Sequence, residues 1–153
     1  IVSVVMYRRA PDRWESRIAL VREFRSPAST PDGFIWELPS GSSFNEKLAP
    51  PEVAREEVYE ETGLEVAGDR LIYRGKRQLA GTMSAHKAHL FSVDLTEEEM
   101  RWLEEQRNVV RGTGVIDGDP SSERLHVRVK MLREIWSEEL VDWTTLGMIM
   151  SVV

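Results

Sequence analysis

The sequence predicts a mixed α/β fold, and three observations lead to this prediction. The chain opens with a run rich in β-branched residues, over residues 1–7, which has the composition of a buried strand. Residues 50–64 begin with two prolines and end near a glycine, the usual start and end of a helix. Strand-like and helix-like segments alternate after that. With 153 residues, the chain is long enough for one domain with a sizeable core.

The first part of the chain contains three predicted strands. Residues 1–7 and 17–24 form the first two, with a turn around Pro11 between them. Residues 34–38 form a short third strand that ends before a proline, and residues 40–49 are predicted to be a loop. The predicted helix follows directly.

The helix over residues 50–64 carries five acidic residues and one basic residue: Glu52, Glu56, Glu57, Glu60, Glu61 and Arg55. Glu57, Glu60 and Glu61 have the spacing i, i+3, i+4 and therefore share one face. Such a cluster has two interpretations. It is either a solvated acidic face or a site for a hard cation, because Mg²⁺ prefers carboxylate oxygens.

The second half of the chain continues the alternation. Residues 71–79 and 88–95 are predicted strands on either side of a turn. Thr96 with Glu99 forms a capping-box pattern that opens a helix. Residues 108–122 form a long predicted loop, and loops of this length in compact domains are often functional.

The last part of the chain contains one more predicted strand and two helices. The strand covers residues 124–131 and a short helix covers residues 132–140, while Asp142 is a plausible N-cap for a final helix. Three tryptophans fall on helical periodicities and are expected in the core: Trp102, Trp136 and Trp143.

The composition excludes several functional classes. The chain is 41% hydrophobic and 30% charged, which is typical of a soluble globular protein. Its net charge of −6 and pI of about 5.2 predict that nucleic acid is not a partner. It has no cysteine, so disulfides, thiol catalysis and cysteine zinc sites are excluded. No apolar run approaches the roughly 20 residues of a membrane span, and there is no signal-peptide pattern, so we expect no membrane partner and a cytoplasmic location.

Residues 57–64, with the sequence Glu-Val-Tyr-Glu-Glu-Thr-Gly-Leu, resemble the C-terminal half of the Nudix box. The family pattern is G-x5-E-x7-R-E-U-x-E-E-x-G-U, where U is apolar, and residues 36–41 resemble the strand and glycine turn that precede it. The box is degenerate: it is one residue longer before Glu57, Glu56 stands at the arginine position, and Leu48 stands at the first glutamate position. The resemblance implies one Nudix domain over residues 1–153, an α/β/α sandwich around a mixed β-sheet.

Other segments resemble the ADP-ribose pyrophosphatase branch of that family: residues 21–25 followed by 36–39, and residues 123–127 followed by 142–146. The resemblance implies a metal-dependent pyrophosphohydrolase that cleaves the diphosphate of a nucleoside diphosphate sugar such as ADP-ribose. Its partner is then a small nucleoside diphosphate. Members of the branch dimerise, so a homodimer is among the expectations.

The resemblance also implies site residues and a cofactor. Mg²⁺ or Mn²⁺ is expected on Glu57, Glu60 and Glu61, helped by a backbone carbonyl near Gly41, with Glu57 and Glu61 in catalytic roles. The expected general base is Glu123, ahead of two other acids of the same loop, Asp119 and Asp117. For each acid the alternative is an ordinary loop residue.

Substrate-binding candidates come from residues that suit phosphate and ribose. Arginine forms bidentate contacts to phosphate, so Arg25 and Arg77 are candidates together with Glu37, and the alternative for each arginine is an ordinary surface position. The altered box also leaves a second function open. In that alternative the chain is a catalytically weak or inactive Nudix domain that binds nucleotides as a sensor or interaction module.

Overall fold

The computed structural model describes residues 1–25, 30–42, 48–112 and 124–153. Within these residues, seven strands form one mixed sheet. The strands are β1 (Val2–Arg8), β2 (Arg17–Phe24), β3 (Phe34–Glu37), β4 (Ser40–Gly41), β5 (Ile72–Ala80), β6 (Ser84–Asp94) and β7 (Leu125–Met131). The α-helices are α1 (Pro50–Thr62), α2 (Glu97–Glu105), α3 (Leu132–Ser137) and α4 (Trp143–Val152), and the short 3-10 helices are η1 (Arg13–Glu15), η2 (Gly68–Arg70) and η3 (Gln106–Asn108).

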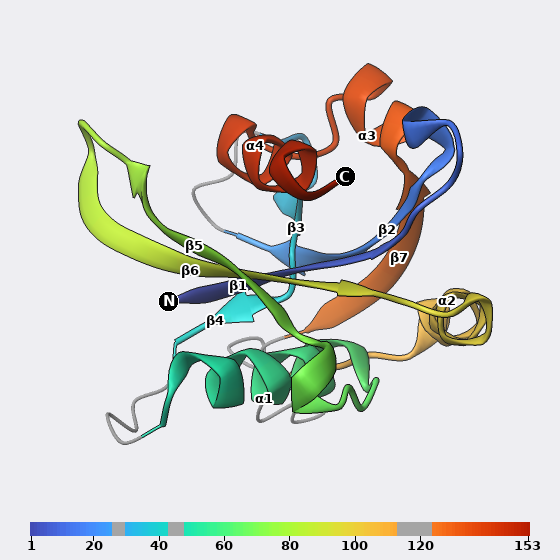
Figure 1. Ribbon diagram of the computed structural model, residues 1–153. Coiled ribbons are helices and arrows are strands. Elements are labelled where there is room, and N and C mark those ends of the chain that lie inside the picture. Colours follow the sequence, from blue (N-terminus) through green and yellow to red (C-terminus); the bar gives the residue numbers. More distant parts are fainter. Residues whose placement is uncertain (26–29, 43–47, 113–123) are drawn as a thin grey trace.

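Helices cover both faces of the sheet, with α1 and α2 on one face and α3 and α4 on the other (Figure 1). The alternation of side chains along β1 shows both faces at once. Val4 and Met6 pack in the core cluster beneath α1 and α2, whereas Val5 and Tyr7 pack in the cluster beneath α3 and α4. The predicted fold class, an α/β/α sandwich around a mixed sheet, is therefore confirmed.

The edge of β2 changes its partner partway along the strand. β2 pairs with β1 over Arg17 to Ala19 and with β3 from Val21 onward, while β7 pairs along its other edge. The chain between β3 and β4 passes the point where β2 leaves β1. There the N–H of Val4 donates to the carbonyl of Pro39 (2.9 Å). The divergence of β2 frees the first residues of β1 to pair with another segment.

β4 is that segment, and it lies where the sequence predicted only a loop. Val2 of β1 pairs with Gly41, and Ser3 pairs with Ser40. The prediction was wrong for these two residues because the pairing satisfies backbone groups that would otherwise be left unpaired in the interior. A local sequence pattern does not encode this long-range need.

α1 begins and ends where the sequence predicted, give or take two residues. Proline occupies its first turn, and Gly63 adopts the left-handed conformation (φ 75°) and donates its N–H to the carbonyl of Tyr59 (2.7 Å). Val53, Ala54 and Val58 are buried against the sheet. The apolar side of the helix therefore fixes which of its acids face the sheet edge.

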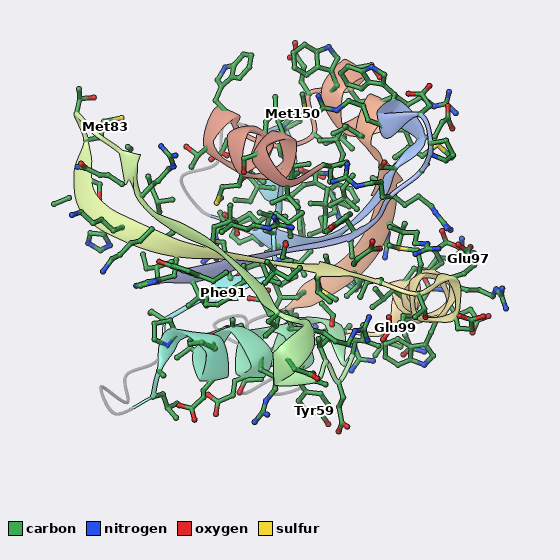
Figure 2. The ribbon with its side chains drawn as sticks, viewed as in Figure 1. Tyr59, Met83, Phe91, Glu97, Glu99 and Met150 are labelled. Atoms are coloured by element: carbon green, nitrogen blue, oxygen red, sulfur yellow. The ribbon has the colours of Figure 1, made fainter. Side chains whose placement is uncertain are left out.

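β5 and β6 form a long hairpin that protrudes beyond the helices (Figure 1). β6 begins at Ser84, four residues before the predicted start. Met83 lies at the tip of the hairpin and is 88% exposed (Figure 2). The distal half of the hairpin therefore has little packed core beneath it.

The prediction of core positions for the tryptophans was wrong for two of the three. Trp102 is half-buried and packs against the core, but Trp136 is 49% exposed and Trp143 is 82% exposed. Trp136 contacts the half-exposed ring of Trp14 edge to face, and Trp143 borders an open groove. Helical periodicity gives the side of a helix, but it does not say where the core beneath that side ends.

None of the helices in the described residues is long and apolar enough to span a membrane.

An ion pair between η2 and α2 generates a stability prediction. Arg70 makes a bidentate contact to the carboxylate of Glu99 (2.5 and 2.9 Å), and this hydrogen bond is the main cause of the lowered pKa of Glu99. A lowered carboxyl pKa contributes stability above the unfolded-state value of about 4.3, and this contribution is lost as the pH falls through the folded-state pKa.

Arg70→Gln is therefore expected to lower the free energy of unfolding by about 1 kcal/mol at pH 7 and by less near pH 3. Urea denaturation at the two pH values measures the difference. Arg101→Gln, at an exposed position of α2, is the control and should change little. A loss for Arg70→Gln that is the same at both pH values would contradict the argument.

Candidate functional site

Two of the predicted metal-binding acids converge on β4. The carboxylate of Glu61 is buried and accepts a hydrogen bond from the backbone N–H of Ser40 (3.1 Å). A Cβ atom added to Gly41 would overlap the carboxylate of Glu57, so this carboxylate lies directly against the glycine backbone. The structure thus brings together Glu57, Glu61 and Gly41, which the sequence assigned to one site.

The local sequence explains this arrangement. Glu57 and Glu61 are one helical turn apart, next to the buried Val58, so they follow the edge of the apolar face of α1. The pairing of Gly41 with Val2 fixes the backbone opposite them. A Cβ atom at this position would take the space of the Glu57 carboxylate, so the flexible end of that side chain would have to move.

Glu60 is exposed to solvent, whereas Glu57 is half-buried and Glu61 is buried. Across the described ranges, no group of three or more histidine, aspartate or glutamate side chains is arranged to hold a metal ion. The structure places Glu57 and Glu61 against the backbone of β4, and the metal site on Glu57, Glu60 and Glu61 stays a prediction.

Glu56, at the arginine position of the box pattern, lies on the outer side of α1. It borders a surface depression with Arg55, Tyr59 and Glu65. Figure 2 shows Tyr59 pointing away from the sheet on this side of the helix. Both Arg55 and Glu56 are exposed, so neither occupies the position beside Glu57 and Glu61.

Two of the three predicted substrate-binding residues contact each other. The guanidinium of Arg25 lies 3.3 Å from the carboxylate of Glu37 and 2.7 Å from that of Glu23. Glu23 is buried in β2, and Glu37 ends β3. The register between β2 and β3 pairs Glu37 with Val21, so the side chain of Glu37 lies on the same face of the sheet as those of Glu23 and Arg25.

A small cavity of about 140 Å³ lies next to β4. Glu37 and Ser40 border it on one side and Asp142 and Thr145 on the other. Ser40 therefore stands between this cavity and Glu61, to which it donates its N–H. Sequence reasoning identified Asp142 only as a helix cap, which it is, since its carboxylate accepts from the N–H of Thr145 (2.7 Å). Nothing in the local pattern indicated that α4 brings it opposite Glu37.

A larger groove, of about 580 Å³, continues from Glu37 and Asp142 across β2 and β3. Phe34 and Trp36 border it, and the guanidinium of Arg22 lies 4.2 Å from the centre of the Phe34 ring. This groove offers flat aromatic and guanidinium surfaces beside the small cavity.

His126 pairs with Arg22 across β2 and β7. Burial is the main cause of its lowered pKa, and the nearby positive charges of Arg128 and Arg22 lower it further. This histidine is therefore neutral near pH 7.

Arg77, the third substrate-binding candidate, lies apart from Arg25 and Glu37. It borders a groove of about 630 Å³ between the β5–β6 hairpin and α4. Leu79 and Thr144 border both this groove and the small cavity, so the two spaces adjoin.

The predicted general base, Glu123, lies outside the described residues, as do Asp117 and Asp119. Most of the predicted loop over residues 108–122 lies outside them as well. Their roles stay predictions.

Comparison with known proteins shows the fold and little more. The chain matches no protein-family model and no curated protein. The apo structure of Trypanosoma brucei MERS1 aligns with a TM-score of 0.51 at 19% identity, over 63% of this chain and 38% of that one. The T. brucei MERS1–RNA complex aligns with a TM-score of 0.50 at 19% identity, over 63% and 34%. A MutT/nudix family protein from Enterococcus faecalis aligns with a TM-score of 0.49 at 15% identity, over 63% and 36%.

The alignments cover little more than a third of the MERS1 chains. Identities this low speak for the fold alone, a mixed sheet with helices on both faces. They do not single out the ADP-ribose pyrophosphatase branch.

The contact between Gly41 and Glu57 generates a prediction. Gly41→Ala should lower the free energy of unfolding by about 1 kcal/mol, the low end of overpacking costs, because the added methyl group must displace only the flexible end of the Glu57 side chain. Gly68→Ala is the matched control, since no atom lies within 4 Å of the added Cβ there.

A double-mutant cycle with Glu57→Ala makes the prediction specific. When the carboxylate is absent, Gly41→Ala should cost much less than in the parent. Equal costs in the two backgrounds, measured by urea denaturation, would show that Glu57 does not occupy this space.

Proposed function

We propose that this chain is a metal-dependent pyrophosphohydrolase that cleaves the diphosphate of a nucleoside diphosphate sugar such as ADP-ribose. The observation that carries the proposal is the convergence of Glu57 and Glu61 on Ser40 and Gly41, beside a cavity that Glu37 borders. The resemblance of residues 57–64 to the Nudix box supports the same chemistry.

The donor set fits a divalent metal ion. Mg²⁺ and Mn²⁺ take carboxylate and backbone carbonyl oxygens and keep several waters, so two carboxylates next to an exposed backbone suffice. Glu57 and Glu61 would hold the ion, with a carbonyl of Ser40 or Gly41, and the absence of a side chain at Gly41 keeps the space open. A bound ion supplies neutralisation of phosphate charge and activation of a water molecule.

The other residues would position the substrate. Arg25 is held by Glu23 and Glu37 at the sheet edge, where its guanidinium can meet a phosphate oxygen. Glu37 borders the cavity, and a carboxylate can accept hydrogen bonds from ribose hydroxyls. The groove along Phe34 and Trp36 has room and flat surfaces for a base. We assign proton transfer to Glu123 on the resemblance alone.

A second candidate function is nucleotide binding without turnover, as a sensor or interaction module. The observation that favours it is the outward position of Glu56, which leaves no arginine from α1 beside Glu57 and Glu61. MERS1 structures include a complex with RNA and one with GDP. A nucleotide-related ligand is common to both candidates. The expectation that nucleic acid is not a partner gains no support from these neighbours, because one of the complexes contains RNA.

Removing the charge of Glu61 tests the metal site. Glu61→Gln keeps an acceptor for the Ser40 N–H, so the fold should survive. Hydrolysis should fall by about 100-fold or more, because a group that stabilises the transition state is lost. Mg²⁺ or Mn²⁺ should raise the melting temperature of the parent and not that of the variant, because a ligand bound only by the folded state stabilises it.

The control for this experiment is Glu65→Gln, an exposed acid just beyond α1. It should leave both the metal-dependent shift and the turnover unchanged. No shift of the parent at millimolar metal, or an equal shift in Glu61→Gln, would exclude the site.

A substrate screen separates the two candidate functions. ADP-ribose, other nucleoside diphosphate sugars, dinucleoside polyphosphates and nucleoside triphosphates are each incubated with Mg²⁺ or Mn²⁺, and products are followed by phosphatase-coupled phosphate release. We expect turnover first with ADP-ribose. A nucleotide that raises the melting temperature without being cleaved, under conditions where metal binds, would instead establish the binding module.

A further inference from the structure

The β5–β6 hairpin carries a charge opposite in sign to that of the whole chain. Residues 72–94 contain four basic residues and one acidic residue, Asp94 at the end of β6, although the formal net charge of the chain is −6. The four are Arg74, Lys76, Arg77 and Lys87. In the described structure none of them lies within 4.0 Å of an acidic side chain. The net charge is a sum over the whole chain, so an acidic pI is compatible with a basic surface on one part of the protein.

Two of these cations border the groove between the hairpin and α4. Arg74 makes one side-chain hydrogen bond among the described residues, from Nε to the hydroxyl of Ser92 (2.8 Å), so its terminal nitrogens can reach a ligand. Arg77 is exposed on the same side. Among the described residues, no acid borders this groove, whereas Asp32 and Glu138 border the groove across β2 and β3. The first groove therefore suits an anion, and the second does not.

Trp143 adds a flat apolar surface to the same groove. It is the first residue of α4 and, at 82% exposed, the most exposed large aromatic side chain of the described chain. Exposed indole next to guanidinium groups is the combination that binds unstacked bases and their phosphates.

We propose that the groove between the β5–β6 hairpin and α4 binds single-stranded nucleic acid, with Arg74 and Arg77 on phosphates and Trp143 stacked on a base. A single strand is required because bases inside a duplex do not offer their faces to a side chain. Guanidinium groups pair with phosphate oxygens in a bidentate manner. This binding does not depend on hydrolysis, although the adjoining cavity at Leu79 and Thr144 would place part of the strand near the candidate site.

The first test measures charge. Binding of a fluorescein-labelled single-stranded RNA of about 12 nucleotides is followed by anisotropy at roughly 50 and 200 mM salt. Arg77→Gln should weaken binding and lower the salt slope by about 1. Arg101→Gln on α2 removes the same charge elsewhere and should change neither value. No binding by the parent at the lower salt, or an equal loss for Arg101→Gln, would overturn the proposal.

The second test measures stacking through the fluorescence of Trp143. RNA should quench the tryptophan emission of the parent, and most of the quenching should vanish in Trp143→Phe, which keeps an aromatic ring and most of the affinity. Trp143→Ala should bind about 10-fold more weakly. Because the side chain is largely exposed, neither change threatens the fold. Quenching that persists in Trp143→Phe would overturn the stacking assignment and with it the proposal.

Two further experiments test the alternatives, which are an acidic protein partner and RNA binding at the carboxylate pair. Polyglutamate should not displace the RNA at matched charge, and equal displacement would point to an acidic protein partner instead. Glu61→Gln should bind RNA as the parent does, because the groove lies apart from the carboxylate pair. Loss of binding in Glu61→Gln would place the RNA at the carboxylate site and refute the groove.

Discussion

The pairing of β4 with the first residues of β1 is the constraint on which the candidate site depends. β2 leaves β1 after Ala19 and continues beside β3, so the start of β1 is free to pair with Ser40 and Gly41. This pairing fixes one backbone N–H toward Glu61 and a bare glycine toward Glu57. It also holds the corner between β3 and β4 in place, which brings Glu37 to the same region. A two-residue strand thus aligns an acidic helix with a cavity on the other side of the sheet.

The sequence predicted the features that depend on local signals. The proline start of α1, its left-handed glycine end and the shared face of Glu57 and Glu61 all follow from spacing within one helix, and the structure has them. β4 could not be predicted, because Ser40 and Gly41 form a strand only through Ser3 and Val2, which lie 37 and 39 positions away in the chain. The contact between Arg25 and Glu37 depends on the register of β2 and β3, which local patterns do not specify. The exposure of Trp143 depends on where the core ends beneath α4.

The carboxylate pair is an electrostatic burden for an isolated domain. Acidic side chains one helical turn apart repel each other, and burial of a carboxylate such as that of Glu61 costs free energy that its partners must offset. Side-chain arrangements that destabilise the fold occur most often at binding and catalytic sites. The divalent cation proposed above would reverse both terms at once, because it would attract the two carboxylates and replace their lost hydration. A glycine at position 41 also leaves room for the Glu57 carboxylate, which a residue with a side chain would displace.

Acidic and basic side chains gather on different parts of the molecule, the acids at Glu57 and Glu61 and the bases on the β5–β6 hairpin. If the proposed function holds, Glu57 and Glu61 would repel phosphate until a cation is bound, so an anionic ligand would need another part of the surface to attract it. The β5–β6 hairpin supplies such a surface, since its four cations face no acidic partner in the described structure. Long-range attraction of this kind raises the rate of encounter and falls with ionic strength. Because the hairpin groove and the small cavity adjoin at Leu79 and Thr144, an anion captured at the basic groove would lie next to the small cavity that Ser40 and Glu37 border.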